Sequence, residues 1–532
     1  MQKLHPLGSV PFQSKPQQIW FWVCAACLSL YLSAALYLCR SGLFLSAGET
    51  AAALVFFLLI AAAVFLALLF LSSRPLPYKA AEARTKLNAK VFLAAAGLSL
   101  LILGVFTAAD YPGAVSVDSA VQWTQAATNR YSNWHPVFHT LLLRLGYLIR
   151  PNYGFVVALQ CGFYSLAAGY LVAVLHAWGM NAWLLLLLEA LITASPIVGN
   201  TMMYLWKDNA MTIGAALLLA QAVNVYFSRG QWLKKLPHAI AFGLALAYTT
   251  LVRHNAIFYT LPLLLFAVLC YRRQLRALLV SSAVLAACLA LVWGPLYASL
   301  GVTYPNNTVE ESVGVPMTVI SDIRKLNPSA LDGETRAFTD AMADETGWEN
   351  YQLHVYNTVK FGKTREVIAR SSMTDILRMA VGAARSDPRT AFLAVAGVTD
   401  LVWGVADEGD ALIDVRNSRD LPGVPVLDGA MNRAGRAVKS VLTAPYTAFP
   451  LRWYFGNIGV SFLLLLIAAL WALGQSGTAS LMLSLPVLCY NLGTMLLLCG
   501  KDARFFAFSP LVSTFLLFVL LKKPPDKEVD AR

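Results

Sequence analysis

The stretch that decides the fold is Val91-Phe-Leu-Ala-Ala-Ala-Gly-Leu-Ser-Leu-Leu-Ile-Leu-Gly-Val-Phe-Thr-Ala-Ala109, which is followed at once by Asp110. A run of this length without a charge can cross a bilayer core about 30 Å thick as a helix. The rest of the chain has the same character, since 58% of its 532 residues are hydrophobic and only 13% are charged. A soluble domain of this length cannot bury so much apolar surface. The sequence therefore predicts an all-α polytopic membrane protein.

Apolar runs of similar length recur along the whole chain. We predict about twelve transmembrane helices, near 19–39, 50–72, 91–109, 154–176, 181–199, 209–227, 238–252, 255–270, 277–299, 456–474, 479–499 and 505–521. The runs 238–252 and 255–270 are short, and Arg253-His254-Asn255 separates them. A broken or re-entrant pair is therefore an alternative to two full spans at this place.

The formal net charge of +12 is explained by the loops between the spans. Basic residues gather in alternate short loops, at Arg74, Lys79, Arg84, Lys86 and Lys90, at Arg229, Lys234 and Lys235, at Arg272, Arg273 and Arg276, and at Lys522 and Lys523. The positive-inside rule then places these loops and both termini in the cytoplasm. We expect a multi-pass protein of the plasma membrane, most naturally a bacterial one, with membrane lipids as partners and no nucleic acid.

Four regions follow from this pattern. Residues 1–90 form an N-terminal two-span extension with a cytoplasmic loop, and residues 91–299 form a transmembrane core with an outer loop at 110–153. Residues 300–455 form an extracytoplasmic insert, mainly α, because helical patterning runs from about 334 to 406. Its segment 388–406 either lies along the membrane interface or is buried within the insert. Residues 456–532 add three spans and a cytoplasmic tail.

The outer loop at 110–153 concentrates polar chemistry beside a membrane surface. Val117, Val121 and Trp123 favour a short amphipathic surface helix, and a second such helix runs from about residue 135 to residue 149. Asp110 and Asp118 lie at the inner edge of this pair. Either carboxylate could be a general base for an acceptor hydroxyl, with a pKa raised by partial burial. The alternatives are a span-end marker for Asp110 and a helix N-terminal charge for Asp118.

Other polar side chains in outer turns suit substrate contacts. Gln122 offers an amide to a sugar, and His135 and His139 are four residues apart, so they share a helix face. These histidines form structural hydrogen bonds at the interface, contact a phosphate or a sugar, or hold a transition metal. Lys207 could neutralise a phosphate, and its neighbour Asp208 could hold a sugar hydroxyl. The alternative is that both residues only mark the end of a span.

Two arginines and one acid remain to be explained. Arg253 lies within an apolar hairpin and needs a partner there, and an anionic lipid phosphate suits a guanidinium. Arg504 occupies a comparable outer turn near the C-terminus. Asp118 and Asp208 together could hold a divalent cation such as Mg²⁺ or Mn²⁺. Glu189, near the centre of a span, is either a proton-coupling site or a structural acid bonded to a neighbouring helix.

The order of these motifs resembles the GT-C superfamily of integral-membrane glycosyltransferases. The resemblance is carried by Asp118-Ser-Ala-Val-Gln122, by the later Trp134-His135-Pro136, by Trp206-Lys207-Asp208, by the cation Arg253 and by Arg504 to Pro510. It implies Asp118 as catalytic base, with Asp110 as its competitor, and Asp208 as a holder of substrate or metal. It also implies that Arg253 and Arg504 face the donor phosphate.

The function expected from this resemblance is transfer of a sugar to an acceptor outside the cell. The donor would be a polyprenyl-phosphate sugar, the acceptor an envelope glycan or glycolipid, and the transfer inverting. The main alternative is a transporter or flippase of lipid-linked or small polar substrates. A polymerase or ligase of surface polysaccharide and a non-catalytic membrane scaffold are two further alternatives.

Overall fold

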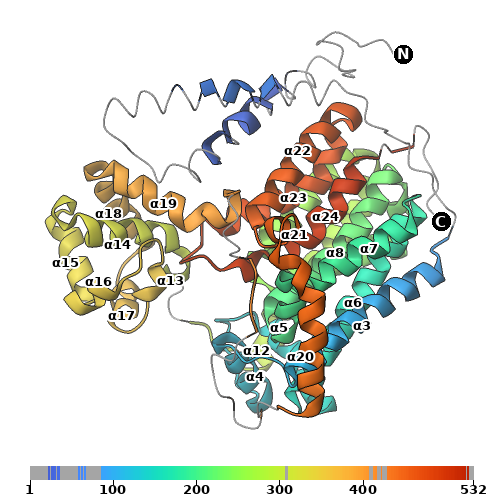
Figure 1. Ribbon diagram of the computed structural model, residues 1–532, viewed down its shortest axis with the longest axis horizontal. Helices are drawn as coiled ribbons and strands as arrows, with labels where there is room; N and C mark the ends of the chain where they lie inside the picture. The colour runs from blue at the N-terminus through green and yellow to red at the C-terminus, as the bar shows by residue number, and fades with distance from the viewer. Residues whose placement is uncertain are drawn as a thin grey trace.

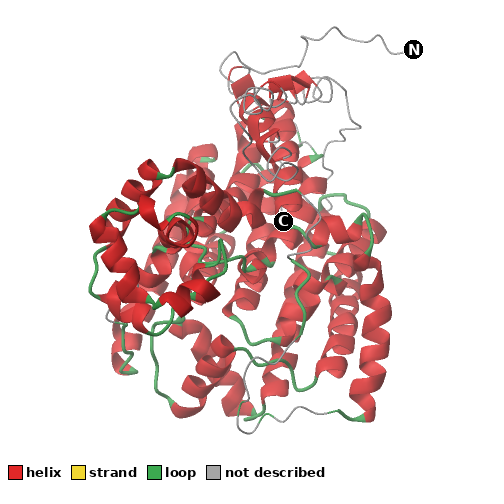
Figure 2. Cartoon of the chain, turned by 60° about the vertical axis from the view of Figure 1, so that its left-hand side comes forward, coloured by secondary structure: helices red, strands yellow, loops and turns green. Residues whose placement is uncertain are grey.

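The computed structural model describes residues 86–522, apart from 306–308, 406–410, 416–420, 422–423 and 425–427, together with 524–525 and scattered positions between 19 and 66. Figure 2 shows the described residues as helices joined by loops, with no strand among them. The all-α class is thereby confirmed for this part of the chain. The predicted spans at 19–39 and 50–72 fall largely outside the described residues, as does most of the predicted region 1–90.

Five described helices are long and apolar enough to cross a membrane. They are α3 (Ala89–Asp110), α6 (Tyr153–Ala177), α8 (Lys207–Phe227), the segment Arg272–Ser299 with α11 (Leu275–Leu291) and α12 (Tyr297–Ser299), and the segment Ala503–Leu520 with α24 (Phe508–Leu520). A sixth candidate is α7 (Ala182–Ala194) with the segment Pro196–Met203, which bends by 56°. Proline at the break removes a helical hydrogen bond, which accounts for the bend.

The other described runs form shorter helices. They are α9 (Leu236–Val252), α10 (Ile257–Cys270), α22 (Ile458–Ser476) and α23 (Leu481–Met495). Arg253 has an extended backbone, with φ −151° and ψ 127°, so the chain breaks between α9 and α10 as the polar triplet predicts. At 1.5 Å per residue the 17 residues of α9 cover about 26 Å, slightly less than a bilayer core. Length and composition therefore support five or six spans in the described chain, fewer than predicted.

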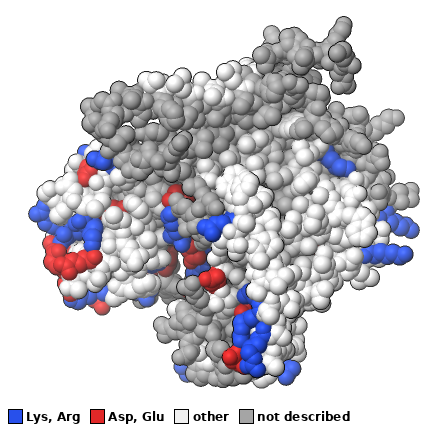
Figure 3. Space-filling view, in the orientation of Figure 1, with Lys and Arg blue, Asp and Glu red and all other residues white. Residues whose placement is uncertain are grey.

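The helices differ in how deeply the protein surrounds them. In its most apolar stretch α8 is 89% buried, whereas the helix at Arg272–Ser299 is only 17% buried. Thus α8 lies at the centre of the bundle (Figure 1), and the low burial of the helix at Arg272–Ser299 places α11 at its edge. In Figure 3 the visible face of the bundle is mostly uncharged, while charged side chains gather over the insert and the lower end. This distribution is the one expected of a bundle surrounded by lipid.

The insert is a helical unit beside the bundle. It contains α13 (Val309–Ser312), α14 (Gly314–Leu326), α15 (Gly333–Met342), α16 (Glu345–Asn350), α17 (Lys363–Ala369), α18 (Met373–Ser386) and α19 (Pro388–Trp403). Ala391 and Ala394 of α19 pack within the insert, and Val398 and Leu401 join the core of the bundle. Of the two interpretations of 388–406, burial fits better, because α19 links the insert to the bundle (Figure 1).

The predicted insert region ends in a helix that packs on the bundle itself. That helix, α20 (Ala430–Thr443), runs along α3 and is followed by the short α21 (Leu451–Phe455). A Cβ added at Gly435 would lie 2.4 Å from the backbone nitrogen of Ala109. Only glycine allows so close an approach of two helix backbones. Residues 430–443 therefore cover the end of α3 that carries Asp110.

The outer loop forms the two predicted helices, α4 (Val117–Thr128) and α5 (Val137–Ile149). Ser116 caps α4, and Pro136 immediately precedes α5. The predicted apolar face of α4 is wrong in one respect. Val117 and Val121 are exposed whereas Trp123 is buried, because a spacing of four residues puts the valines on one side and Trp123 on another.

Candidate functional site

Four segments that are far apart in the sequence meet at one end of the bundle. Asp118 Oδ2 lies 2.9 Å from Arg504 Nη1 and 3.6 Å from Lys207 Nζ, and Asp118 Oδ1 lies 4.0 Å from His135 Nε2. We call Asp118, His135, Lys207 and Arg504 the Asp118 cluster. Its members come from α4, the loop before α5, the first residue of α8 and the turn before α24.

Local interactions hold Asp118 against the start of α8. The Ser116 side chain caps α4 and also accepts a hydrogen bond from Trp206 Nε1 at 2.7 Å. The backbone nitrogen of Ala114 donates to the carbonyl of Met203 at 2.8 Å. Since Trp206 directly precedes Lys207, these contacts fix the two segments beside each other. Asp118 and Lys207 are therefore neighbours because of backbone and cap interactions as well as their opposite charges.

Arg504 is oriented on three sides. Its Nε donates to Asp502 Oδ2 at 2.8 Å, and its guanidinium lies 5.0 Å from the ring centre of Trp206 and 5.2 Å from that of Phe505. Rings in these positions stabilise a cation and restrict its rotation. The guanidinium keeps Nη1 directed at Asp118, with 18% of the side chain exposed.

A second ion pair, between Arg253 and Asp208, lies beside the cluster and is more deeply buried. The guanidinium of Arg253 lies 4.8 Å from the ring centre of Phe505, and Arg504 contacts the same ring. The side chain of Arg253 also forms a hydrogen bond with that of Tyr490. Arg253 thus has the partner that its burial demands. That partner is a carboxylate of the protein, so the predicted residues Arg253 and Asp208 neutralise each other.

Gln122 and His139 are buried behind the cluster. Gln122 Nε2 lies 3.0 Å from His139 Nδ1 and donates to Thr140 Oγ1 at 3.1 Å. These contacts join α4 to α5 and keep both helices in place. Of the two histidines, only His135 has a nitrogen within 4.0 Å of Asp118 among the described contacts. The structural interpretation therefore suits His139, and His135 lies in the site.

Asp110 has different surroundings. It ends α3, and its Oδ2 lies 2.6 Å from Nζ of Lys439 on α20. One lysine thus neutralises Asp110, whereas Asp118 faces Arg504, Lys207 and His135. The two carboxylates that the sequence could not separate are distinguished by these contacts.

The charges of the cluster set its protonation. Burial raises the pKa of Asp118, but Lys207, Arg504 and His135 outweigh burial and hold that pKa well below its usual range. The expectation of a raised pKa is therefore wrong. The cations lower the pKa of Asp118 by more than desolvation raises it. Burial and the charge of Lys207 lower the pKa of His135 to about 3. A neutral ring agrees with its Nδ1 lying 3.2 Å from Lys207 Nζ, where it accepts a hydrogen bond.

A divalent cation between Asp118 and Asp208 does not fit these contacts. Each carboxylate lies against an arginine, and Lys207 adds a further positive charge at Asp118. Within the described ranges, no three side chains of His, Cys, Asp or Glu are grouped as metal ligands. Mg²⁺ and Mn²⁺ require several oxygen ligands. No step proposed below passes through a metal.

Three residues that the sequence interpretation did not assign complete the site. Trp206 and Phe505 flank the guanidinium of Arg504, and Tyr490 interacts with Arg253 while its hydroxyl donates to the carbonyl of Phe505 at 2.9 Å. Trp206 and Phe505 could have been predicted as part of the site, because they are sequence neighbours of Lys207 and Arg504. Tyr490 lies inside an apolar run, and nothing in the sequence marks it.

Comparison with protein-family models gives no match for this chain. Comparisons with the curated proteins and with the solved structures give no match either.

Proposed function

We propose that this protein is a membrane glycosyltransferase of the GT-C type. It would move a sugar from a polyprenyl-phosphate donor to an envelope glycan or glycolipid at the outer face of the plasma membrane. The observation that carries the proposal is the Asp118 cluster. One partly exposed carboxylate and two cations converge there from segments nearly 400 residues apart, at a bundle end where lipid headgroups would lie.

The cations would bind the donor phosphate. A guanidinium forms paired hydrogen bonds with phosphate oxygens, and a lysine adds a compact charge. Arg504 and Lys207 are the two cations of the cluster, and Asp118 is the anion that they hold in the absence of donor. Arg253 supports Arg504 through the shared ring of Phe505. Positive charge placed where the leaving group gains negative charge lowers the barrier to its departure.

Asp118 would take the proton of the acceptor hydroxyl. The acceptor oxygen forms a bond to the anomeric carbon from the face opposite the phosphate, while the bond from that carbon to the phosphate oxygen breaks. The electron pair of the broken bond leaves on the phosphate, and the anomeric configuration inverts. A bound phosphate shares Arg504 and Lys207, so it weakens the two interactions that depress the pKa of Asp118. Donor binding thereby makes Asp118 a stronger base.

The membrane arrangement forms part of the proposal. Twelve spans, cytoplasmic termini and an outward-facing Asp118 cluster satisfy the positive-inside rule. Supporting this orientation, α8 starts at Lys207 in the cluster and leads to the basic loop at Arg229 and Lys234. Likewise, α9 starts after Lys235 and ends next to Arg253.

Glu189, the acid within a span that suggested a transporter, makes hydrogen bonds to neighbouring side chains. Glu189 is buried, and its Oε1 accepts hydrogen bonds from Ser99 at 2.7 Å and from Thr193 at 2.6 Å. Ser99 belongs to α3, so this interaction joins two neighbouring helices. Among the described residues, the side-chain hydroxyls of Ser99, Thr193 and Tyr164 are the partners of Glu189, as expected of a structural acid.

A comparison of envelope glycans tests the proposed function. Cells without the gene are complemented with the wild type, with Asp118→Asn or with Asp110→Asn, and the membrane level of each variant is measured. We expect a glycan modification that is lost with the gene, restored by the wild type and by Asp110→Asn, and not restored by Asp118→Asn. Restoration by Asp118→Asn at a normal membrane level would contradict the proposed base. Identical glycans with and without the gene would contradict the enzymatic function.

A further inference from the structure

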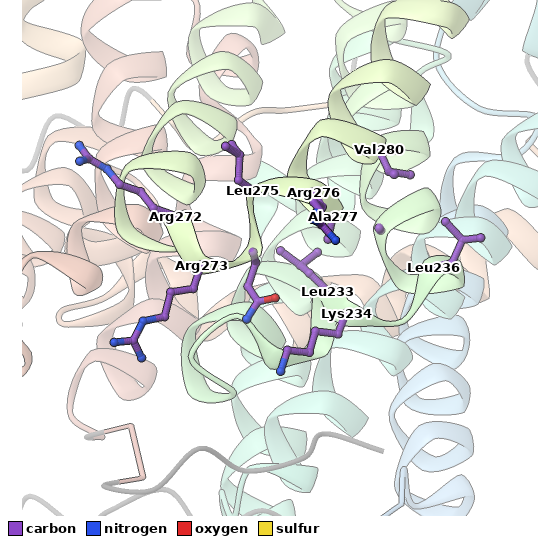
Figure 4. Close-up of a pocket in the computed structure, with 11 residues that line it drawn as sticks. Leu233, Lys234, Leu236, Arg272, Arg273, Leu275, Arg276, Ala277 and Val280 are labelled. Carbon is purple, nitrogen blue, oxygen red and sulfur yellow. The ribbon is translucent and has the colours of Figure 1, made fainter.

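A basic cavity lies at the end of the bundle opposite the Asp118 cluster. It has a volume of about 650 Å³, and its lining includes Lys234, Leu236, Arg272, Arg276 and Val280. Figure 4 shows that its cations come from two segments, Lys234 from the turn before α9 and the three arginines from the start of the helix that contains α11. The volume is within the range of small-molecule sites.

The length of α8 sets the position of this cavity. The helix begins at Lys207 in the Asp118 cluster and ends at Phe227, just before the turn that carries Lys234. Its 21 residues cover about 31 Å, which equals the thickness of a bilayer core. The cavity therefore lies at the level of the headgroups on the membrane surface opposite the cluster.

The lining combines two kinds of chemistry. Lys234, Arg272 and Arg276 are exposed and have no acidic partner among the described residues. Beyond them the surface is apolar, with Leu236 59% exposed and Leu279 58% exposed on the outside of α9 and α11. The helix that leaves the cavity is only 17% buried in its most apolar stretch. Cations at one end of an exposed apolar surface match a molecule with an anionic head and a hydrocarbon tail.

We infer that this cavity binds the headgroup phosphate of an anionic phospholipid, with the acyl chains lying along α9 and α11. Lys234, Arg272 and Arg276 bind the phosphate, and the leucines contact the chains. A soluble phosphate would use the cations but not the exposed apolar surface. The two helices hold that surface together, since Ser281 Oγ donates to the carbonyl of Ala239 at 2.8 Å. This inference does not depend on the proposed function, because it concerns the other membrane surface.

The test is lipid binding by the full-length protein in detergent, measured by native mass spectrometry. The probes are short-chain phosphatidylglycerol, phosphatidylcholine with the same chains, and inorganic phosphate as competitor. We expect saturable binding of phosphatidylglycerol and little binding of phosphatidylcholine. Removing two cations with Arg272→Gln and Arg276→Gln should weaken binding on the order of 30-fold, from the usual contribution of a basic residue near anionic lipid.

A matched control removes the same charge elsewhere. Lys86 and Lys90 are exposed near the start of α3, at the end of that helix remote from Asp110, so Lys86→Gln with Lys90→Gln should leave lipid affinity within twofold. Because loss of arginines could disturb folding, Val280→Trp places a bulky ring in the cavity while keeping every cation, and it should also weaken binding at least tenfold. Equal affinity in the arginine variant and the lysine control would overturn the site, as would unchanged affinity in Val280→Trp. Displacement of the lipid by an equal concentration of inorganic phosphate would overturn the assignment to a lipid.

Discussion

Replacing Asp118 by Asn should separate phosphate binding from catalysis. Asparagine keeps the size of the side chain but removes the anion that Arg504 and Lys207 hold in the absence of donor. If these cations bind the donor phosphate, Asp118 competes with that phosphate. The variant should therefore bind an isoprenoid phosphate more tightly than the wild type and yet fail to transfer sugar. Loss of a general base typically lowers kcat by at least about 100-fold.

The distances give the size of the gain in affinity. At an effective dielectric constant of about 20, charges 2.9 Å and 3.6 Å apart attract by about 6 and about 5 kcal/mol. The side chains of Asp118, Lys207 and Arg504 remain 23%, 16% and 18% exposed, so water screens much of this attraction. We expect a tenfold to 100-fold tighter Kd, which corresponds to about 1.4 to 2.7 kcal/mol.

Isothermal titration calorimetry of the detergent-solubilised protein with farnesyl phosphate measures this affinity. Farnesol provides the control for the hydrocarbon chain, and Asp110→Asn provides the control for loss of a carboxylate. Because Asp110 is paired with Lys439, we expect that control to bind as the wild type does. Arg504→Gln should shift affinity in the opposite direction, toward weaker binding. Weaker or unchanged binding in Asp118→Asn, with the protein folded, would refute the idea that the carboxylate and the phosphate share one pair of cations.

Three further predictions concern protonation, packing and the intramembrane acid. Burial lowers the pKa of His135 from 6.5 to about 3. Between these values the unfolded chain binds more protons than the folded protein, so acid destabilises the fold, by about 2 kcal/mol at pH 5 for this ring. In SDS titrations, His135→Gln should therefore lose less stability between pH 7 and pH 5 than the wild type does. An equal pH dependence in both proteins would argue against a buried neutral ring. Gly435→Val should lower the unfolding free energy by about 2 to 3 kcal/mol, since its Cβ meets the Ala109 backbone, and an unchanged SDS midpoint would mean that α20 does not pack so closely on α3. Glu189→Gln should retain the envelope glycan phenotype because an amide oxygen can still accept from Ser99, whereas complete loss of the phenotype would favour the proton-coupled transporter.

The candidate site was partly predictable from the sequence. Lys207, Arg253 and Arg504 are recognisable because each interrupts or ends an apolar run, where a charge is costly without a partner. Asp118 is recognisable by its place in the polar loop that follows a span. Their partners are not recognisable in this way. The pairing of Arg253 with Asp208 rather than with an outside phosphate depends on how α8 and α9 pack, and no local pattern encodes that contact.

The pKa of Asp118 shows the same limit. From the sequence, a carboxylate at a membrane edge is expected to be desolvated, and desolvation alone raises its pKa. The sign of the shift reverses because Arg504, 386 positions further along the chain, lies 2.9 Å away. The face of α4 was also misjudged, since exposed valines and buried glutamine are the reverse of the usual amphipathic pattern. The hydrogen bonds of Gln122 to His139 and Thr140 account for its burial between α4 and α5.

Helical character and an apolar composition could be predicted from the residues alone, since hydropathy and helical periodicity are local properties of a chain. The positions of charges at the ends of apolar runs could be predicted in the same way. Which of those charges meet, which carboxylate faces two cations, and that a basic cavity lies about one bilayer thickness away depend on how the helices pack. Electrostatic interactions act over a few ångströms between residues hundreds of positions apart, so they are set by packing and not by order along the chain.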